Sequence, residues 1–290
     1  MEWITRLNQA IAYMEEHLDD EISYEELGKI CCCSSYHFQR MFAYMADMPL
    51  SEYIRRRKMS LAAVDVQSTD AKIIDIALKY GYNSPTAFTR AFQLVHGVAP
   101  SQLRKEGITV KSYPPLLFKI TVKGVQEMNY RIEKKDGFRV VGISCPMEKE
   151  AEQNFAKIPM FWHEAGNDGT LDKLVGMMDT ELKGVLGVCA AIGDDWKYYI
   201  AVASTQADES LEEYEVPSFT WAVFSGEGVC PKAIQDLEQQ IMAEWLPTSG
   251  YEFANGPDVE LYLSPDMKDA KFDVWVPVEK YLLVFIIVCN

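Results

Sequence analysis

Two kinds of side chain in this sequence could recognise other molecules. Arg40 and Arg90 each stand between two phenylalanines, in the related pentapeptides FQRMF and FTRAF. An arginine that leaves a helix in this setting suits the O6 and N7 atoms of guanine. Glu260 and Tyr262 alternate along a predicted strand, so a carboxylate and an aromatic ring would leave the same face. Base recognition and cation binding are therefore the chemistries that these residues suggest.

A run of cysteines, Cys31 to Cys33, allows three interpretations. Consecutive residues cannot all face one tetrahedral zinc ion without a folded loop and a fourth ligand, for which His37 is the nearby candidate. The thiols could instead sense oxidants or electrophiles. They could also fill a turn, because free cysteine behaves as a small hydrophobic residue. We expect structural filling, with no metal and no cofactor.

The elements that must position the arginines are helical. Apolar residues recur every three or four positions through residues 1–105, which predicts an all-α domain of about seven short helices. The two pentapeptides begin at Phe38 and Phe88, 50 residues apart. Each follows a short helical stretch, a tight turn and a serine, Ser34 or Ser84, that would cap the next helix. The repeat predicts two helix-turn-helix motifs.

The second helix of such a motif enters the major groove of DNA. Helical spacing turns the phenylalanines inward and leaves polar residues outward near the start of each helix. The stretch between the copies keeps its helical period for about five turns and would act as a rigid spacer, so one chain could read two successive grooves. The residues predicted to contact DNA are Tyr36, Gln39 and Arg40 in the first copy and Thr86, Thr89, Arg90 and Gln93 in the second.

Residues 108–126 carry glycines and a Pro-Pro pair and break the helical period, so we expect a linker between a first domain, 1–107, and a second, 127–290. In the second domain a strand-helix-strand-strand unit occurs twice, which predicts an α+β fold with a ligand cleft where the two units meet. Aromatic residues would line that cleft around Glu260 and attract organic cations, at roughly 0.5–2 kcal/mol per ring. They are Trp162, Tyr198, Trp221, Tyr262 and Trp275. Periodicity alone leaves the alternative that they fill the core.

Charge and cysteine usage limit the partners. The net charge of −15 is concentrated after residue 110, because residues 1–110 carry 12 basic and 14 acidic side chains. The basic run RRRK at 55–58 leaves one face of the helical domain suited to phosphate. Seven cysteines without a repeated spacing, and no secretory leader, indicate the cytoplasm. The apolar tail 281–289 is too short to span a membrane, and we expect a strand or a contact surface.

The motifs SSYHFQRMF, YIRRRKMSLAA, IIDIALKYGYNS and FTRAFQLVHGVAPSQLR resemble the AraC/XylS family of bacterial transcription regulators, in its right-origin-binding and multiple-antibiotic-resistance branch. The resemblance covers residues 1 to about 105. It implies base contact by Tyr36, Gln39 and Arg40 and by Thr86, Thr89 and Arg90. It also implies strain at Cys32, where the family prefers glycine.

The motifs YEVPSFTWAVFSGEG, EWLPTSGYEF, DVELYL and DVWVPV resemble the GyrI-like effector-binding domain over residues 127–280. That resemblance implies a central acidic residue, matched by Glu260, in an aromatic pocket for cationic or amphipathic molecules.

We therefore expect a one-component regulator that binds double-stranded promoter DNA, responds to a small effector and works with RNA polymerase. No Ser-His-Asp series or phosphate-binding glycine loop is evident, so we expect no enzyme. The alternative is a small-molecule hydrolase or a drug-sequestering protein built on the second domain.

Overall fold

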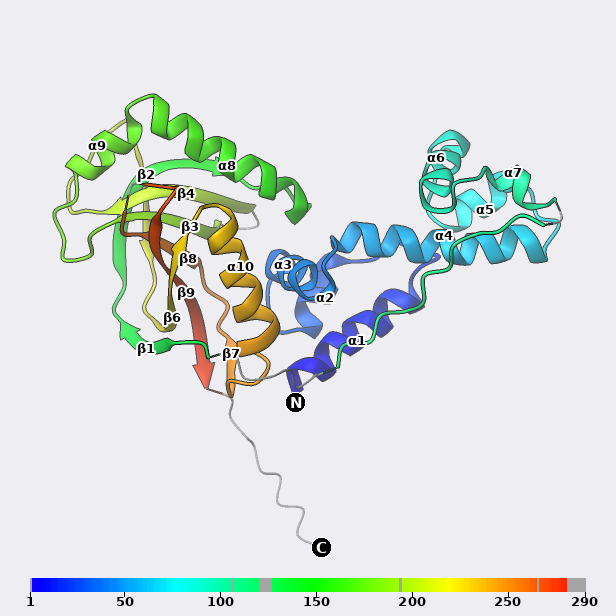
Figure 1. The fold of residues 1–290 in the computed structure, drawn as a ribbon, viewed down its shortest axis with the longest axis horizontal. Helices are drawn as coiled ribbons and strands as arrows, with labels where there is room; N and C mark the ends of the chain where they lie inside the picture. The colour runs from blue at the N-terminus through cyan, green and yellow to red at the C-terminus, as the bar shows by residue number, and fades with distance from the viewer. Residues whose placement is uncertain (1, 106, 120–126, 193–194, 265, 281–290) are drawn as a thin grey trace, which may run out of the picture. The chain divides into compact units, whose positions relative to one another are not determined.

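The computed structural model describes residues 2–105, 107–119, 127–192, 195–264 and 266–280. The apolar tail 281–289, predicted to form a strand or a contact surface, lies outside these ranges. Two units make up the chain, Met1–Val122 and Lys123–Asn290 (Figure 1). No helix in the described part of the chain combines the length and the apolarity needed to cross a lipid bilayer.

Helices alone form the first unit within its described residues, as the 3.6-residue period predicts. The helix-turn-helix motifs are α2–α3 and α5–α6, and the 19-residue α4 between them is about 28 Å long. Figure 1 shows one motif near each end of α4. The helices are α1 (Glu2–Glu16), α2 (Tyr24–Ile30), α3 (Ser35–Ala46), α4 (Leu50–Ser68), α5 (Ile73–Lys79), α6 (Pro85–His96) and α7 (Pro100–Leu103).

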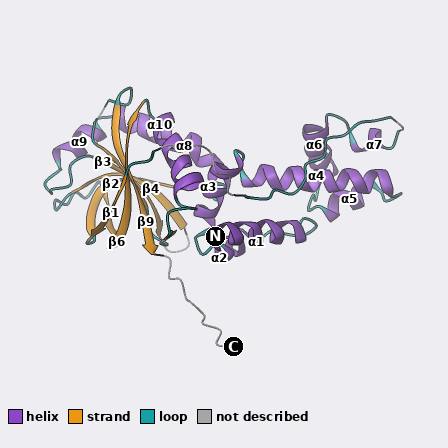
Figure 2. Ribbon diagram, turned by 60° about the horizontal axis from the view of Figure 1, so that its bottom comes forward, coloured by secondary structure: helices purple, strands orange, loops and turns teal. Residues whose placement is uncertain are grey.

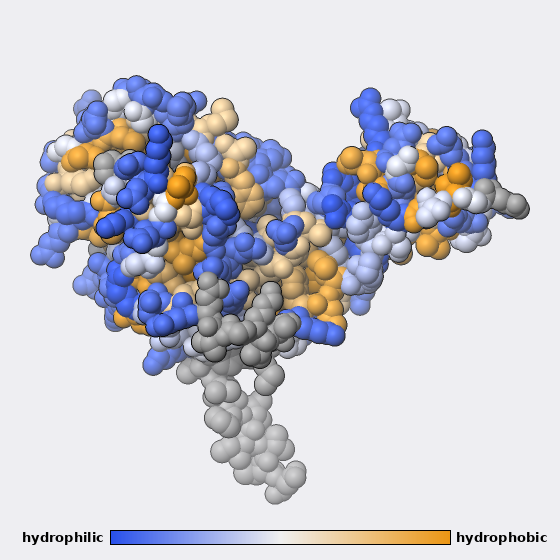
Figure 3. All heavy atoms as spheres, viewed as in Figure 1, coloured by the Kyte–Doolittle hydropathy of each residue, from blue (hydrophilic) through white to orange (hydrophobic). Residues whose placement is uncertain are grey.

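The predicted N-caps are confirmed. The Ser34 hydroxyl accepts the backbone N–H of His37 at 3.1 Å, and the Ser84 hydroxyl accepts that of Ala87 at 3.4 Å. The phenylalanines of both pentapeptides are completely buried, so the repeat forms two small cores of the same design. Apolar residues also lie at the surface of this unit among hydrophilic ones (Figure 3). Among its described residues, the exposed large apolar side chains are Val64, Ile74, Leu78, Leu94 and Leu117.

The two turns of the motifs share one geometry. The N–H of Cys33 donates to the Gly28 carbonyl at 2.9 Å, and the N–H of Tyr82 donates to the Ala77 carbonyl at 2.9 Å. The residue between each pair of helices that must adopt a left-handed conformation is Cys32 in the first copy, with φ of 56°, and Gly81 in the second, with φ of 82°. The strain implied at Cys32 is therefore present, because a side chain is disfavoured in this conformation.

The first part of the predicted linker packs on the helical unit. Asn8 exchanges two hydrogen bonds with the backbone of Phe118, at 3.0 and 2.9 Å. The N–H of Leu116 donates to the Tyr53 hydroxyl at 3.3 Å, and Arg57 donates to the Tyr113 carbonyl. Residues 108–118 therefore belong structurally to the first unit, because these bonds satisfy backbone groups that the irregular conformation leaves open.

A single twisted antiparallel sheet forms the frame of the second unit, in the order β1-β6-β9-β8-β3-β4-β2-β5, with β7 beside β9. Figure 2 shows its strands fanning out. Its strands are β1 (Tyr130–Lys135), β2 (Phe138–Pro146), β3 (Val185–Ile192), β4 (Asp195–Ala203), β5 (Glu212–Val216), β6 (Phe219–Gly228), β7 (Tyr251–Phe253), β8 (Asp258–Tyr262) and β9 (Ala270–Lys280). Its helices are α8 (Ala151–Asn167), α9 (Thr170–Gly176), α10 (Lys232–Gln240) and the π-helical η1 (Ile241–Trp245).

The predicted duplication is confirmed. The first copy is β2, α8, β3 and β4, and the second is β6, α10, β8 and β9. Each predicted leading strand is divided in two, at Gly137 and at Pro217, and the short outer piece pairs with the other copy, β1 with β6 and β5 with β2. The two copies meet where β3 pairs with β8, at the centre of the sheet.

One core cluster contains residues of strands from both ends of the sheet, including Val216 of β5, Val140 of β2 and Trp221 of β6. Side chains from opposite ends can share one core only if the sheet curls around it. The inner face of the curl is therefore this core. The other face carries the helices, since Trp162 of α8 contacts Tyr262 of β8 with 4.9 Å between the ring centroids.

Candidate functional site

Helix α6 presents an open polar face. Thr86, Arg90 and Gln93 are exposed and Thr89 is half-buried. Their spacing of three and four residues places them along one side of the helix, opposite the buried Phe88 and Phe92. The outward positions predicted for Thr86, Arg90 and Gln93 are confirmed.

Helix α3 differs. Tyr36 is 5% exposed and Gln39 is 6% exposed, so the prediction that these two side chains face outward is wrong. Four successive residues, 36–39, are buried, and successive residues of a helix point around most of its circumference. The first turn of α3 is therefore less exposed than that of α6. Arg40 is half-buried, and its guanidinium lies 5.8 Å from the ring centroid of Tyr36.

The basic run at 55–58 is largely occupied by internal partners. Arg57 is 7% exposed and pairs with Glu15 of α1 at 2.6 Å. Arg55 and Arg56 both pair with Glu52. Arg57 thus joins α4 to α1, whereas the pairs of Arg55 and Arg56 lie within α4, and the prediction of a free phosphate-facing patch is weakened accordingly.

The cysteine run behaves as turn filling. Burial raises the pKa of the Cys31 thiol to about 12, and burial also raises the pKa of Cys33. A protonated thiol is a poor nucleophile and a poor metal ligand. The neighbouring His37 is engaged as well, since its Nδ1 lies 2.7 Å from the Ser34 hydroxyl. Cys32 is the exposed member of the run.

Glu260 lies at the centre of the sheet, on β8, directly opposite Gly187 of β3 and Val274 of β9. Two phenols bind the same carboxylate oxygen: Tyr198 donates to Oε2 at 2.9 Å and Tyr262 donates to it at 3.0 Å. The indole N–H of Trp162 donates to the Tyr198 hydroxyl at 2.9 Å, which extends the chain of hydrogen bonds to α8. We call these four residues, Trp162, Tyr198, Glu260 and Tyr262, the Glu260 cluster.

The electrostatics of the Glu260 cluster keep both phenols as donors. Burial raises the pKa of Tyr198 well above its usual value, and the nearby Glu260 carboxylate raises it further. The same two causes, in the same order, raise the pKa of Tyr262. Each hydroxyl therefore keeps its proton over the physiological range, and the cluster presents a carboxylate surrounded by three aromatic rings.

A glycine on the neighbouring strand β3 makes room for the Glu260 cluster. A Cβ atom at Gly187 would lie 2.2 Å from the Tyr198 hydroxyl oxygen and 2.8 Å from Oε2 of Glu260. Only glycine leaves room for the pair at this place. Sequence reasoning missed Gly187, although a glycine inside the apolar strand VLGVCAAI is a signal of close approach.

Two of the predicted pocket residues lie elsewhere. Trp275 pairs with Val259, and residues 259 and 260 point to opposite faces of β8. Trp275 and Trp221 therefore belong to the inner core, where they are 2% and 0% exposed and 5.8 Å apart between ring centroids. The prediction that these two residues join Glu260 is wrong, because the register of the sheet places them on its other side.

The chain resembles known proteins in both units. The family described as an integron-associated effector binding protein matches residues 131–278, and a helix-turn-helix domain family matches residues 27–106. The chain is 27% identical over 267 residues to the transcriptional regulator Rob of Salmonella typhimurium, which covers 88% of this chain and 89% of that protein. Over 98 residues it is 35% identical to the regulatory protein SoxS of Escherichia coli, which covers 34% of this chain and 92% of that protein.

Among solved structures, an integron cassette protein from the mobile metagenome of Vibrio cholerae matches 52% of this chain and 95% of its own, with 19% identity and a TM-score of 0.39. The effector-binding family spans half of the chain and the helix-turn-helix family spans the internal repeat. The chain therefore belongs to the AraC family of transcription regulators and carries a GyrI-like effector-binding domain.

Proposed function

We propose that this regulator reads promoter DNA through α6 and α3 and that a small organic cation binds at the Glu260 cluster and changes its activity. RNA polymerase is the protein partner in this proposal, and the cytoplasm is its location. Neither a hydrolase nor a drug-sequestering role is favoured, since the relatives are named as regulators.

The DNA part of the proposal rests on α6. Arg90 is exposed and makes no hydrogen bond or ion pair with the residues that the structure describes, so its guanidinium is available to a guanine edge. Thr86, Thr89 and Gln93 flank it. Base recognition by Tyr36, Gln39 and Arg40 of α3 requires in addition that the first two become accessible when DNA binds.

The test of α6 uses a duplex selected from a random-sequence library and fluorescence anisotropy. We expect Arg90→Ala to weaken specific binding by about tenfold, because a bidentate arginine-guanine pair contributes roughly 1–3 kcal/mol. Arg90→Lys keeps the charge but loses the planar fork, so it should weaken specific binding nearly as much while leaving binding to unrelated DNA intact. The matched control is Lys271→Ala, an exposed cation of the second unit.

The effector part rests on the single observation that two protonated phenols, those of Tyr198 and Tyr262, donate hydrogen bonds to one carboxylate oxygen of Glu260, at 2.9 and 3.0 Å. A carboxylate surrounded by rings attracts a delocalised cation through charge and through the ring faces. Tetraphenylphosphonium and tetraphenylborate have the same shape and opposite charges. We expect the cation to bind, the borate not to, and Glu260→Gln to reduce cation binding by about tenfold or more.

Regulation is tested by linkage. If the cation changes the affinity for DNA by some factor, DNA must change the affinity for the cation by the same factor. Equal affinities with and without DNA would show that the Glu260 cluster binds cations without controlling DNA binding. Unchanged DNA binding in both Arg40→Ala and Arg90→Ala would remove the assignment of these helices.

A further inference from the structure

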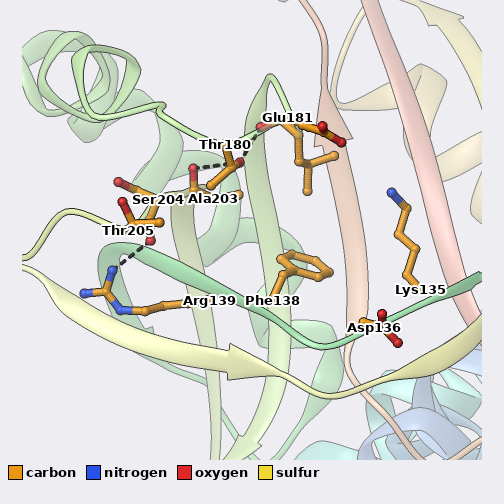
Figure 4. Close-up of a pocket in the computed structure, with 10 residues that line it drawn as sticks. Lys135, Asp136, Phe138, Arg139, Thr180, Glu181, Ala203, Ser204 and Thr205 are labelled. Atoms are coloured by element: carbon orange, nitrogen blue, oxygen red, sulfur yellow. Dashed lines mark hydrogen bonds between the residues drawn. The ribbon is translucent and has the colours of Figure 1, made fainter.

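The inner face of the curled sheet opens into a pocket of about 320 Å³ that the proposed function does not use. Its wall includes Phe138 of β2, Leu182 before β3, Ala203 of β4 and Lys135 at the end of β1 (Figure 4). The volume lies at the lower end of the range of small-molecule sites. Phe138 and Leu182 also pack against the inner core, so the floor of the pocket is apolar.

Two cations lie at this pocket, and they differ. Arg139 pairs with Glu213 at 2.5 Å and donates to the carbonyls of Ser204 and Gln206 at 2.7 and 2.9 Å. Figure 4 shows Arg139 directed away from Phe138 and Lys135. Its charge is therefore neutralised within the wall.

Lys135 has no such partner. Its side chain is half-buried, its ammonium lies 4.8 Å from the centroid of the Trp275 ring, and no carboxylate of the described residues forms an ion pair with it. The acids of the pocket, Asp136 and Glu181, are exposed at the rim, where water screens them. Lys135 is thus the partly buried charge of the pocket that no carboxylate of the described residues neutralises.

Behind the floor of the pocket lies a core that contains two buried tryptophans. Phe138 meets Trp275 edge to face, with 6.2 Å between the centroids, and Trp275 in turn contacts Trp221. The indole N–H groups of both tryptophans are buried and meet no acceptor among the described residues. Neither tryptophan lines the pocket, so these donors belong to the core and not to the ligand site.

We propose that this pocket is a second effector site, for a small organic anion that carries a carboxylate on an aromatic or branched apolar body. The carboxylate pairs with Lys135 and the apolar body lies on Phe138 and Leu182. The site is separate from the Glu260 cluster because neighbouring residues of β8, such as Val259 and Glu260, face opposite sides of the sheet. Both sites nevertheless include a residue of β4, Ala203 in the pocket and Tyr198 in the Glu260 cluster, so an anion and a cation could influence each other through that strand.

The experiment uses the full chain and isothermal titration calorimetry with three probes of one shape, namely 4-phenylbutyrate, 4-phenylbutanamide and 4-phenylbutylammonium. We expect 4-phenylbutyrate to bind at least about tenfold more tightly than the other two, because an ionised partner strengthens the hydrogen bond to Lys135. Lys135→Gln should remove that preference. Lys134→Gln is the matched control, since Lys134 is the exposed neighbour that leaves the opposite face of β1.

The outcome separates this proposal from the one above. Glu260→Gln should leave 4-phenylbutyrate binding unchanged, and Lys135→Gln should leave tetraphenylphosphonium binding unchanged, with near-ultraviolet circular dichroism showing that each variant is folded. Tighter binding of the ammonium probe, equal binding by wild type and Lys135→Gln, or loss of 4-phenylbutyrate binding in Glu260→Gln would each overturn the proposal of an anion site.

Discussion

The glycine opposite Glu260 permits a direct test of the effector site. In Gly187→Ala the new methyl group would lie 2.2 Å from the Tyr198 hydroxyl oxygen and 2.8 Å from Oε2 of Glu260. Tyr198 is 2% exposed and its ring has little freedom to move, so the hydrogen bond between the two side chains must break or the strands must separate.

The magnitude follows from two costs. Overpacking a tight site costs about 1–3 kcal/mol, and losing a hydrogen bond to a charged group costs about 1.5–3 kcal/mol. The two costs do not add in full, because breaking the hydrogen bond lets the side chains move and reduces the overpacking. We therefore expect the free energy of unfolding of the second unit to fall by about 2–4 kcal/mol. Such a loss corresponds to a shift of about 1–2 M in the midpoint of urea unfolding for a unit of this size.

The assay is urea unfolding followed by tryptophan fluorescence, together with tetraphenylphosphonium titration of the folded variant. Gly166→Ala in α8 is the control, because a Cβ there meets only Leu171, at 3.8 Å. That variant should keep or gain stability, by up to about 1 kcal/mol. If Gly187→Ala unfolds at the wild-type midpoint and binds the cation as wild type does, the close approach of Tyr198 and Glu260 is refuted.

Three further predictions concern the helical unit. Gly28→Ala should destabilise it by about 2 kcal/mol in thermal unfolding, even after the gain in helix propensity. The reason is that the new Cβ would lie 2.7 Å from the Cys33 carbonyl oxygen, a backbone atom that cannot rotate away. A variant more stable than wild type would contradict this. Arg57→Ala should lower the free energy of unfolding by about 3 kcal/mol, because it leaves Glu15 without its buried partner. Arg56→Ala should lower it by less than about 1 kcal/mol. Equal losses in the two variants would argue against a stabilising ion pair between Arg57 and Glu15. Burial raises the pKa of Cys31 from 9.0 in the unfolded chain to about 12, so its contribution to stability is complete below pH 9 and is lost as the pH rises toward 12. Cys31→Ala should therefore flatten the pH dependence of the free energy of urea unfolding between pH 9 and 12. The same pH dependence in the variant as in wild type would contradict the burial of this thiol.

Local patterns determined much of this protein. The helical period, the serine caps at Ser34 and Ser84 and the repeated pentapeptides lie within about 15 residues of one another in each copy, and local spacing decides such elements. The duplicated strand-helix-strand-strand order was visible for the same reason. The pairing of Glu260 with Tyr262 was correct because alternation along a single strand needs no knowledge of its neighbours.

The tertiary structure decided what depends on pairing between distant segments. Trp221 and Trp275 alternate along their strands as clearly as Tyr262 does. Strand register decides whether they lie on the same face of the sheet as Glu260, and a shift of one residue exchanges the two faces. The pairing of Arg57 with Glu15 and the room left by Gly187 likewise arise from segments far apart in the chain. Sequence spacing describes one segment at a time, whereas burial and ion pairing are properties of the segments that folding brings together.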